Sequence, residues 1–316
     1  GVVMNIDNCI DEKLAALDQA LSTNKRIKTF FPDKQACDEP IPYLDVDTQD
    51  EICLRMQTGE HITRGATTIA GWMIGVPGVV FLPWLASSSL FEAGVLFVSV
   101  LFVLVVLPLL WDLFSPMPYP VIFNRRTQEV HAYFKGELYH IQWDKARAIA
   151  YEDYMVNQYS GKTNVGYLEI LLQDYNDPDK WIWANLSMPL GRTIEMQSSL
   201  WEYLRSYMNN GPWFDEHGNP RKSDSYNRQL LTAYRKNTRQ RLKEKRANIR
   251  PDDSTSRLAY YAFLIWSPME FLREWIYFFA VKRSVRTWPK EVQERLKPNG
   301  PTTSLTELQQ TQRSDN

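Results

Sequence analysis

The sequence predicts an α+β membrane protein: a transmembrane helical hairpin, then an antiparallel β domain with a closing helix, then C-terminal amphipathic helices. Three observations predict this class. Residues 65–111 carry one formal charge, Glu92. Short alternating strands follow from Pro120, and a helical period begins near Thr193. The expected parts are a helical and loop segment over 1–64, the hairpin over 65–113, the β domain over 118–211, a basic and amphipathic helical region over 212–297, and a disordered tail over 298–316.

The apolar region divides into two arms, residues 66–86 and 93–111, separated by a bend at Ser87–Ser89. One crossing of a bilayer needs roughly 20 apolar residues, so the region is long enough for two helices. Gly71 and Gly75, four residues apart, predict a close approach between the two arms. We therefore expect a helical hairpin in the membrane.

The positive charges predict how the hairpin is oriented. Arg55 and Arg64 precede the first arm, Arg125 and Arg126 follow the second, and the bend has no Lys or Arg. The positive-inside rule then keeps both termini in the cytoplasm. We find no cleavable signal peptide, so the hairpin itself would be the targeting signal. The three unevenly spaced cysteines are expected to be free thiols.

After the hairpin the apolar period changes from helical to alternating. The turns at Asn124–Thr127 and Lys135–Glu137 separate short β-rich runs, as in an antiparallel meander. An amphipathic helix is expected from Thr193 to Met208, ended by Asn210 and Gly211. The expected strands are 120–123, 130–134, 138–143, 146–152, 166–173 and 181–186.

Six or seven strands closed by one helix are the outline of a pleckstrin-homology-like (PH-like) fold. The stretch PVIFNRRTQEVHAYFKGELYHIQWDKARA follows the two-helix anchor directly. In this respect the chain resembles an uncharacterised bacterial family of inner-membrane hairpin proteins with a small PH-like β domain, associated with type VI secretion and polymorphic-toxin loci. The resemblance implies a multi-pass protein of the bacterial inner membrane that acts as an immunity or accessory protein. It supplies no catalytic residues.

The last third of the chain contains a helix-start pattern. Ser267 suits an N-cap, Pro268 the first helical position and Glu270 the third. Residues 258–266 would then form a separate element. Because charged groups are costly at mid-bilayer, we favour a helix at the membrane interface over a third crossing, and a helix packed on the β domain stays possible.

The sequence shows none of the common catalytic patterns. A phosphate-binding glycine loop, a zinc-spaced His and Glu pair and a nucleophile elbow are all missing. We therefore expect no enzyme activity, no cofactor and no metal. His131 and His140 could face each other across a hairpin, and we interpret them as a structural pair.

Two functions from different classes fit these observations. The first is a membrane-anchored immunity protein that binds a cognate secreted toxin and neutralises it by occlusion, with the aromatic anchors Trp181, Trp183, Trp213 and Phe214. The alternative is a membrane-tethered lipid-binding scaffold or secretion-accessory protein. Its basic block, residues 234–250, would meet anionic inner-leaflet lipids rather than a specific nucleic acid. The residues of that patch would be Arg239, Arg241, Lys243 and Arg246.

Overall fold

The computed structural model describes residues 6–24, 26–57, 59, 63–80, 91–157, 161–250, 252–284 and 286–314. These residues form two compact units. The sheet unit comprises Gly1–Gly59, Pro118–Arg235 and Thr287–Asn316, and the helical unit comprises Glu60–Met117 and Lys236–Arg286. The segment 1–59, expected as a separate helical and loop part, therefore belongs to the same unit as the β domain.

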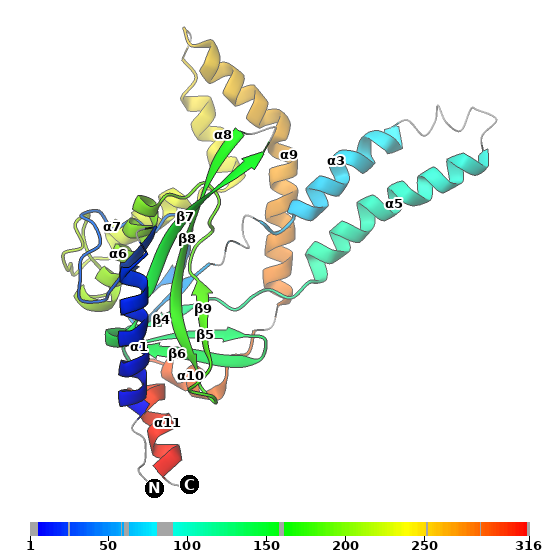
Figure 1. Ribbon diagram of the computed structural model, residues 1–316. Helices are drawn as coiled ribbons and strands as arrows, with labels where there is room; N and C mark the ends of the chain where they lie inside the picture. The colour runs from blue at the N-terminus through cyan, green and yellow to red at the C-terminus, as the bar shows by residue number, and fades with distance from the viewer. Residues whose placement is uncertain are drawn as a thin grey trace. The chain divides into compact units, whose positions relative to one another are not determined.

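One antiparallel sheet of nine strands organises the described part of the sheet unit, in the order β1-β7-β8-β6-β5-β4-β3-β2, with β9 paired to β8 (Figure 1). Six strands lie close to the positions that the alternating pattern predicts. They are β4 (Ile122–Asn124), β5 (Glu129–Phe134), β6 (Glu137–Gln142), β7 (Ala148–Asn157), β8 (Gly161–Asp174) and β9 (Trp181–Asn185).

Three further strands come from the N-terminal segment, which the sequence analysis assigned to a helix and a loop. They are β1 (Ile27–Phe30), β2 (Val46–Gln49) and β3 (Cys53–Met56). β1 pairs with β7, while β3 pairs with β4. Each is only four residues long, too short for a period to stand out, and each is stabilised by partners that are distant in sequence.

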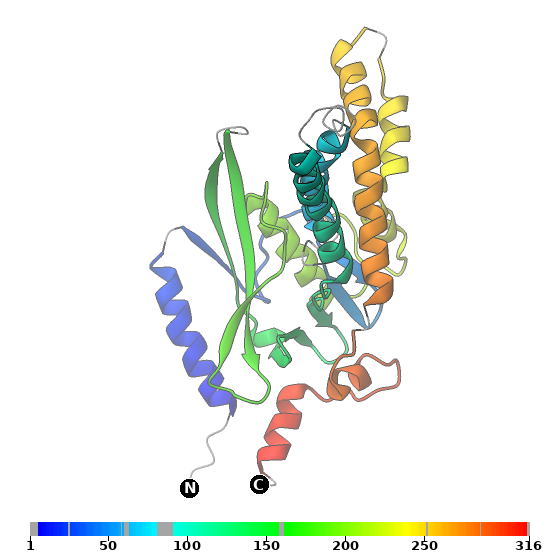
Figure 2. The same cartoon turned by 90° about the vertical axis from the view of Figure 1, so that its right-hand side faces the viewer.

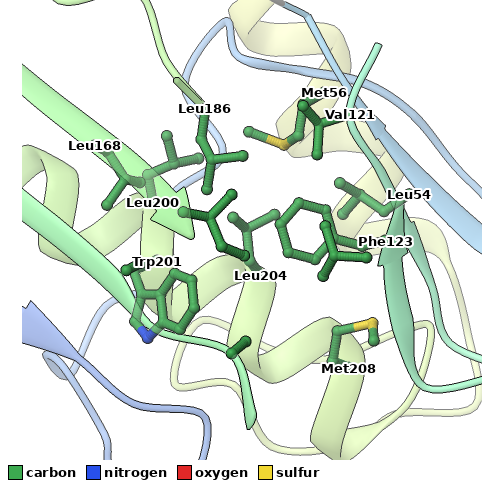
Figure 3. Close-up of a cluster of buried hydrophobic side chains, with 14 of the residues drawn as sticks. Leu54, Met56, Val121, Phe123, Leu168, Leu186, Leu200, Trp201, Leu204 and Met208 are labelled. Atoms are coloured by element: carbon green, nitrogen blue, oxygen red, sulfur yellow. The ribbon is translucent and has the colours of Figure 1, made fainter. Parts of the chain in front are cut away.

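The sheet curls around α6 (Ile194–Asn210), which is the predicted closing helix. Thr193 caps it, because its hydroxyl accepts the backbone N–H of Met196, and Gly211 ends it at a positive φ of 120°. Figure 3 shows Trp201 and Leu204 of α6 among side chains from opposite parts of the sheet, such as Phe123 and Leu168. This cluster is the main hydrophobic core.

Further helices belong to the described part of the sheet unit. They are α1 (Ile6–Ser22), the 3-10 turn η1 (Trp143–Lys145), α7 (Ser225–Tyr234), α10 (Lys290–Arg295) and α11 (Leu305–Ser314). α11 lies in the tail that we predicted to be disordered. Its Leu305 is fully buried in a small cluster with Leu138 and Val292, so the apolar contact orders the segment and the prediction was wrong.

The described residues of the helical unit include the helices α3 (Ala66–Val80), α5 (Phe91–Phe114), α8 (Thr238–Ala247) and α9 (Ser254–Arg283). α3 and α5 pack on each other as the glycine spacing predicts. A Cβ atom on Gly71 would lie 2.3 Å from the carbonyl oxygen of Leu104. Asp112, near the end of α5, accepts the backbone N–H and the hydroxyl of Thr68 at the start of α3.

Within the described residues, we find no helix with both the length and the apolar character needed to cross a membrane. This overturns the predicted transmembrane hairpin and, with it, the multi-pass inner-membrane localisation and its cytoplasmic termini. α3 has 15 residues, about 22 Å of helix against the roughly 30 Å of a hydrocarbon core. α5 is longer, but it contains Pro108 and its last turns include Asp112. The expected bend at Ser87–Ser89 lies outside the described residues.

α9 also differs from the prediction, because it is one helix of 30 residues with Pro268 inside it. A proline removes one backbone donor and leaves the carbonyl four residues earlier without its partner. Here that carbonyl belongs to Leu264, and the Ser267 hydroxyl donates to it at 2.7 Å. The Ser and Pro pair that reads as a helix start therefore maintains a continuous helix.

Candidate functional site

A two-stranded extension of the sheet is the most prominent candidate binding feature of the sheet unit. β7 and β8 pair continuously from Ala148 and Ile170 out to Asn157 and Gly161. β1 pairs only with Ala148–Tyr151 of β7. The outer half of the β7–β8 hairpin therefore continues beyond β1 as a narrow ribbon (Figure 2).

The end of this ribbon presents apolar side chains to solvent. Tyr154 and Met155 are about half exposed, and Val156 is 80% exposed. The Lys162 ammonium lies 3.4 Å from the centre of the Tyr154 ring, a cation–π contact across the ribbon. We call Tyr154, Met155 and Val156 the hairpin patch. Exposed apolar groups of this kind beside charges are typical of sites that bind another molecule.

Sequence reasoning missed the hairpin patch. The predicted strands ended at residue 152 and began again at 166, because Asp153, Asn157 and Gly161 weaken the strand pattern. The signal that could have found it is the run Tyr154, Met155 and Val156, three strand-favouring or neutral residues, with Thr163 opposite Met155.

The predicted anchors Trp181 and Trp183 lie on β9 and are half-buried. They pack against a small cluster formed by Leu171 with Ile10 and Leu14 of α1. α1 is also held by ion pairs at its rim, including Arg147 to Asp18 and Lys13 to Asp179. α1 therefore covers much of the surface that these two tryptophans were expected to offer to a partner.

The other two predicted anchors are separate from these. Phe214 is fully buried, with its ring 4.8 Å from that of Tyr203, and its backbone N–H donates to the Asn227 side chain. Its predicted exposure was wrong, because a bridge between Phe214 and Pro220 folds the loop onto the core. Trp213 is half-buried beside it. The four aromatic residues therefore do not form one surface.

The predicted basic patch lies together on α8 in the helical unit. Arg239, Lys243 and Arg246 are exposed. Arg241 is partly covered, donates to the carbonyl of Lys236, and lies 4.0 Å from the carboxylate of Glu270. With Lys245, which is also exposed, the helix carries four solvated cations, and binding to anionic lipids stays a prediction.

A buried polar cluster joins β5, β6 and α11. His131 and His140 are directly opposite in the antiparallel register, as the sequence analysis anticipated. Glu129 lies between them, 3.5 Å from Nδ1 of His140 and 4.0 Å from Nε2 of His131. All three side chains are almost completely buried.

The Glu129 carboxylate is also the anchor of α11. Both of its oxygens accept the backbone N–H of Leu305 at 2.8 Å, and one accepts Thr306. A helix N-terminus favours a negative charge. Although burial opposes ionisation, the two histidines and these N–H donors hold the pKa of Glu129 below its usual range. Burial lowers the pKa of His131 to about 4.

Gln309 of α11 completes the cluster. Its amide nitrogen donates to the carbonyl of Tyr175, which turns its oxygen towards Nε2 of His140 at 3.1 Å. His140 must then donate through Nε2. Both rings are buried, and their only hydrogen bond to a side chain is that of His140 to Gln309, while both ring nitrogens of His131 and Nδ1 of His140 have no hydrogen-bond partner. The hydrogen bonds of Glu129 and His140 to α11 make the cluster a structural lock between the sheet and α11.

A second buried charge pair fixes the N-terminal strands. Asp45 and Arg192 meet at 2.7 Å, and Asp45 also accepts the backbone N–H of Met188. Burial raises the pKa of Asp45 to about 6, against the opposing effect of Arg192. The Arg192 guanidinium lies 4.3 Å from the centre of the Tyr43 ring. Asp45 lies in the N-terminal segment that we expected to form a helix and a loop, and this buried pair ties that segment to the core.

The part of the chain that the structure describes contains no group of three or more His, Cys, Asp or Glu residues that could hold a metal ion. The Glu129 carboxylate is already engaged, because both of its oxygens accept the backbone N–H of Leu305 in α11. The hairpin patch, by contrast, is exposed to solvent.

Comparison with known proteins gives one family match, to a model described as a family of unknown function (DUF6708), over residues 98–297. No curated protein matches, and no solved structure matches. The association with type VI secretion and toxin loci therefore stays a prediction, whereas the membrane hairpin of that resemblance is contradicted by the helices of the described residues. Because the matched region covers more than half of the sequence, the chain belongs to the DUF6708 family.

Proposed function

We propose that this protein is a non-catalytic binding protein that neutralises a cognate secreted toxin by occlusion, using the hairpin patch as its principal contact. The observation that carries the proposal is the continuation of β7 and β8 beyond β1, with Val156 80% exposed. A ribbon of two strands is narrow enough to enter a cleft on another protein.

The composition of the hairpin patch suits a protein partner. Tyr154 and Met155 are residue types enriched at protein interfaces, and Lys162 supplies a charge at the rim. The outer edge of β7 beyond Tyr151 also keeps backbone groups for a partner strand. The partner can therefore gain both apolar and main-chain contacts.

The interior of the sheet unit supports a binding rather than a catalytic role. Its most strongly buried acid and histidine cluster is occupied by α11, and the Asp45 and Arg192 pair joins two segments of chain. Both sets of groups are used for structure. The choice of a toxin as the partner rests on the sequence resemblance to proteins of toxin loci. A protein that binds such a toxin would act as its inhibitor rather than as an enzyme.

The test is protection of growing cells. The full chain is co-expressed with the product of the reading frame beside its gene, and survival is compared for the natural protein and a Y154S/M155S/V156S variant. We expect the natural protein to protect and the variant to bind at least 30-fold more weakly, because loss of a hot spot costs about 2 kcal/mol or more. Purified proteins then give the dissociation constant.

The matched control is Phe134→Ser, which removes an equally exposed aromatic ring elsewhere in the sheet unit. It should protect as well as the natural protein. Full protection by the triple variant would exclude the hairpin patch as the contact. Harmless deletion of the gene beside an active adjacent toxin would exclude the immunity role itself.

A further inference from the structure

The long helix α9 presents its large apolar side chains outwards. Ile265 is 80% exposed and Trp275 is 53% exposed, although both lie within a continuous helix of the helical unit. Such a face is too apolar for a surface that only meets water. We call Leu258, Tyr261, Ile265, Phe271, Trp275 and Phe278 the α9 face, and the exposed Leu264 and Phe279 lie on the same side of the helix.

The opposite side of α9 is the polar one, and it points into the helical unit. Glu274 accepts the backbone N–H and the hydroxyl of Thr238 at the start of α8, both at 2.6 Å. The Glu270 carboxylate lies 4.0 Å from the guanidinium of Arg241 on α8. These contacts fix the rotation of the helix about its axis, so the α9 face cannot turn inwards.

The residues of the α9 face lie at equal spacings before and after Pro268, which is itself exposed. Tyr261 and Trp275 lie seven residues before and after it, while Ile265 and Phe271 lie three residues before and after it. At 100° per residue these positions fall evenly on either side of the direction in which Pro268 points. Such a face can match itself when a second copy runs in the opposite direction.

The two ends of α9 carry different charged residues, which can favour one relative direction of two paired helices. Asp252 and Asp253 stand at its start, with Arg257 in the first turn, whereas Lys282 and Arg283 stand in its last turn. In an antiparallel pair, the two aspartates of one helix lie beside Lys282 and Arg283 of the other. In a parallel pair, like charges would meet at both ends, which costs affinity.

We propose that the protein forms a two-fold symmetric dimer in which the α9 helices of two copies pack antiparallel, crossing at Pro268. Tyr261 of each copy then packs beside Trp275 of the other. A closed two-fold contact uses the same surface on both copies, which a self-matching face allows. Six side chains per copy, each covering about 100 Å², approach the roughly 1,200 Å² of a specific interface.

The test measures the association of the full chain by sedimentation velocity over a range of concentrations. Asp252→Lys and Lys282→Glu are each expected to raise the dissociation constant of the dimer roughly tenfold, because each places like charges together twice in a symmetric pair. The variant that combines both substitutions restores opposite charges and should return to the natural value. Both side chains are exposed, so these changes leave the fold intact.

Two apolar variants complete the design. Trp275→Glu should abolish the dimer, whereas Phe102→Glu, at an equally exposed position on α5, should leave it unchanged. A monomer at all concentrations would overturn the proposal. So would charge variants that fail to rescue each other, which is the outcome if the α9 face instead covers another protein or a lipid surface.

Discussion

The Ser267 hydroxyl donates to the carbonyl of Leu264 at 2.7 Å and so replaces the hydrogen bond that Pro268 removes from the middle of α9. Without this bond, a proline in a helix interior leaves an acceptor unsatisfied. The pair also explains why a sequence that favours a helix start at residue 267 is found within a helix.

Replacing Ser267 by Ala is expected to lower the free energy of unfolding by about 1 kcal/mol, since one carbonyl loses its donor. The effect should nearly vanish when Pro268 is also replaced by Ala, because the backbone N–H then returns. Urea unfolding of the two single variants and the double variant measures this coupling. Additive effects would show that Ser267 acts independently of the proline.

Gly71 is where α3 comes closest to α5. An added methyl group would lie 2.3 Å from the carbonyl oxygen of Leu104 and 2.9 Å from Cγ of Pro108. Gly71→Ala should therefore destabilise the protein by about 2 kcal/mol, despite the better helix propensity of alanine. Thermal unfolding compares it with Ala70→Ser on the exposed side of the same helix. A gain in stability would contradict the close approach.

Glu129 anchors α11 through its charge as well as its shape. Glu129→Gln keeps most of the volume but loses the carboxylate that accepts Leu305 twice, so α11 should open more readily, by about 2 kcal/mol. Hydrogen exchange of amides 305–312 should become faster while that of β7 and β8 stays the same. The control is Glu137→Gln at the more exposed end of β6. Equal exchange rates of amides 305–312 in the two variants would show that the Glu129 carboxylate does not anchor α11.

Acid should weaken this same region. His131 is buried and its pKa falls from 6.5 to about 4, so between these pH values the unfolded chain binds a proton that the folded chain does not. The free energy of unfolding then falls as the pH falls from 6.5 to 4, by up to about 3 kcal/mol. The pKa of Glu129 is also lowered from its ordinary value of 4.5, so the free energy of unfolding falls further as the pH drops below 4.5.

Unfolding measured across pH 4 to 7 checks this expectation. Replacing His131 by Phe should flatten the profile in that window, whereas His217→Phe, at an exposed position, should not. Arg295, Glu129 and His140 all face His131 and stay in place in the variant. An unchanged slope for His131→Phe would assign the acid sensitivity to another group.

A charge-pair variant tests the N-terminal strands. Asp45→Asn leaves the Arg192 cation buried without its carboxylate, which should cost about 3 kcal/mol or more. The double variant with Arg192→Met removes the stranded charge and should recover most of that loss. If the double variant is no more stable than Asp45→Asn, the pair does not act as a unit.

Local pattern was enough to predict much of the sheet unit. The inner parts of the strands from Ile122 to Asn185, the closing helix and the facing of His131 and His140 follow from period and turn residues within a few positions of each other. The close approach at Gly71 also follows from local spacing. Residue type and spacing therefore determined these elements, because each depends on neighbours in the chain.

Only the tertiary structure decided the rest. β1, β2 and β3 form because strands distant in the sequence supply their hydrogen bonds. α11 is ordered because Glu129 accepts the backbone N–H of Leu305 and because Leu305 packs against Leu138. The extent of the apolar helices, the burial of Phe214 and the outward direction of Trp275 depend on which elements cover which side chains. Burial is a property of the packed molecule, and no local run of residues contains it.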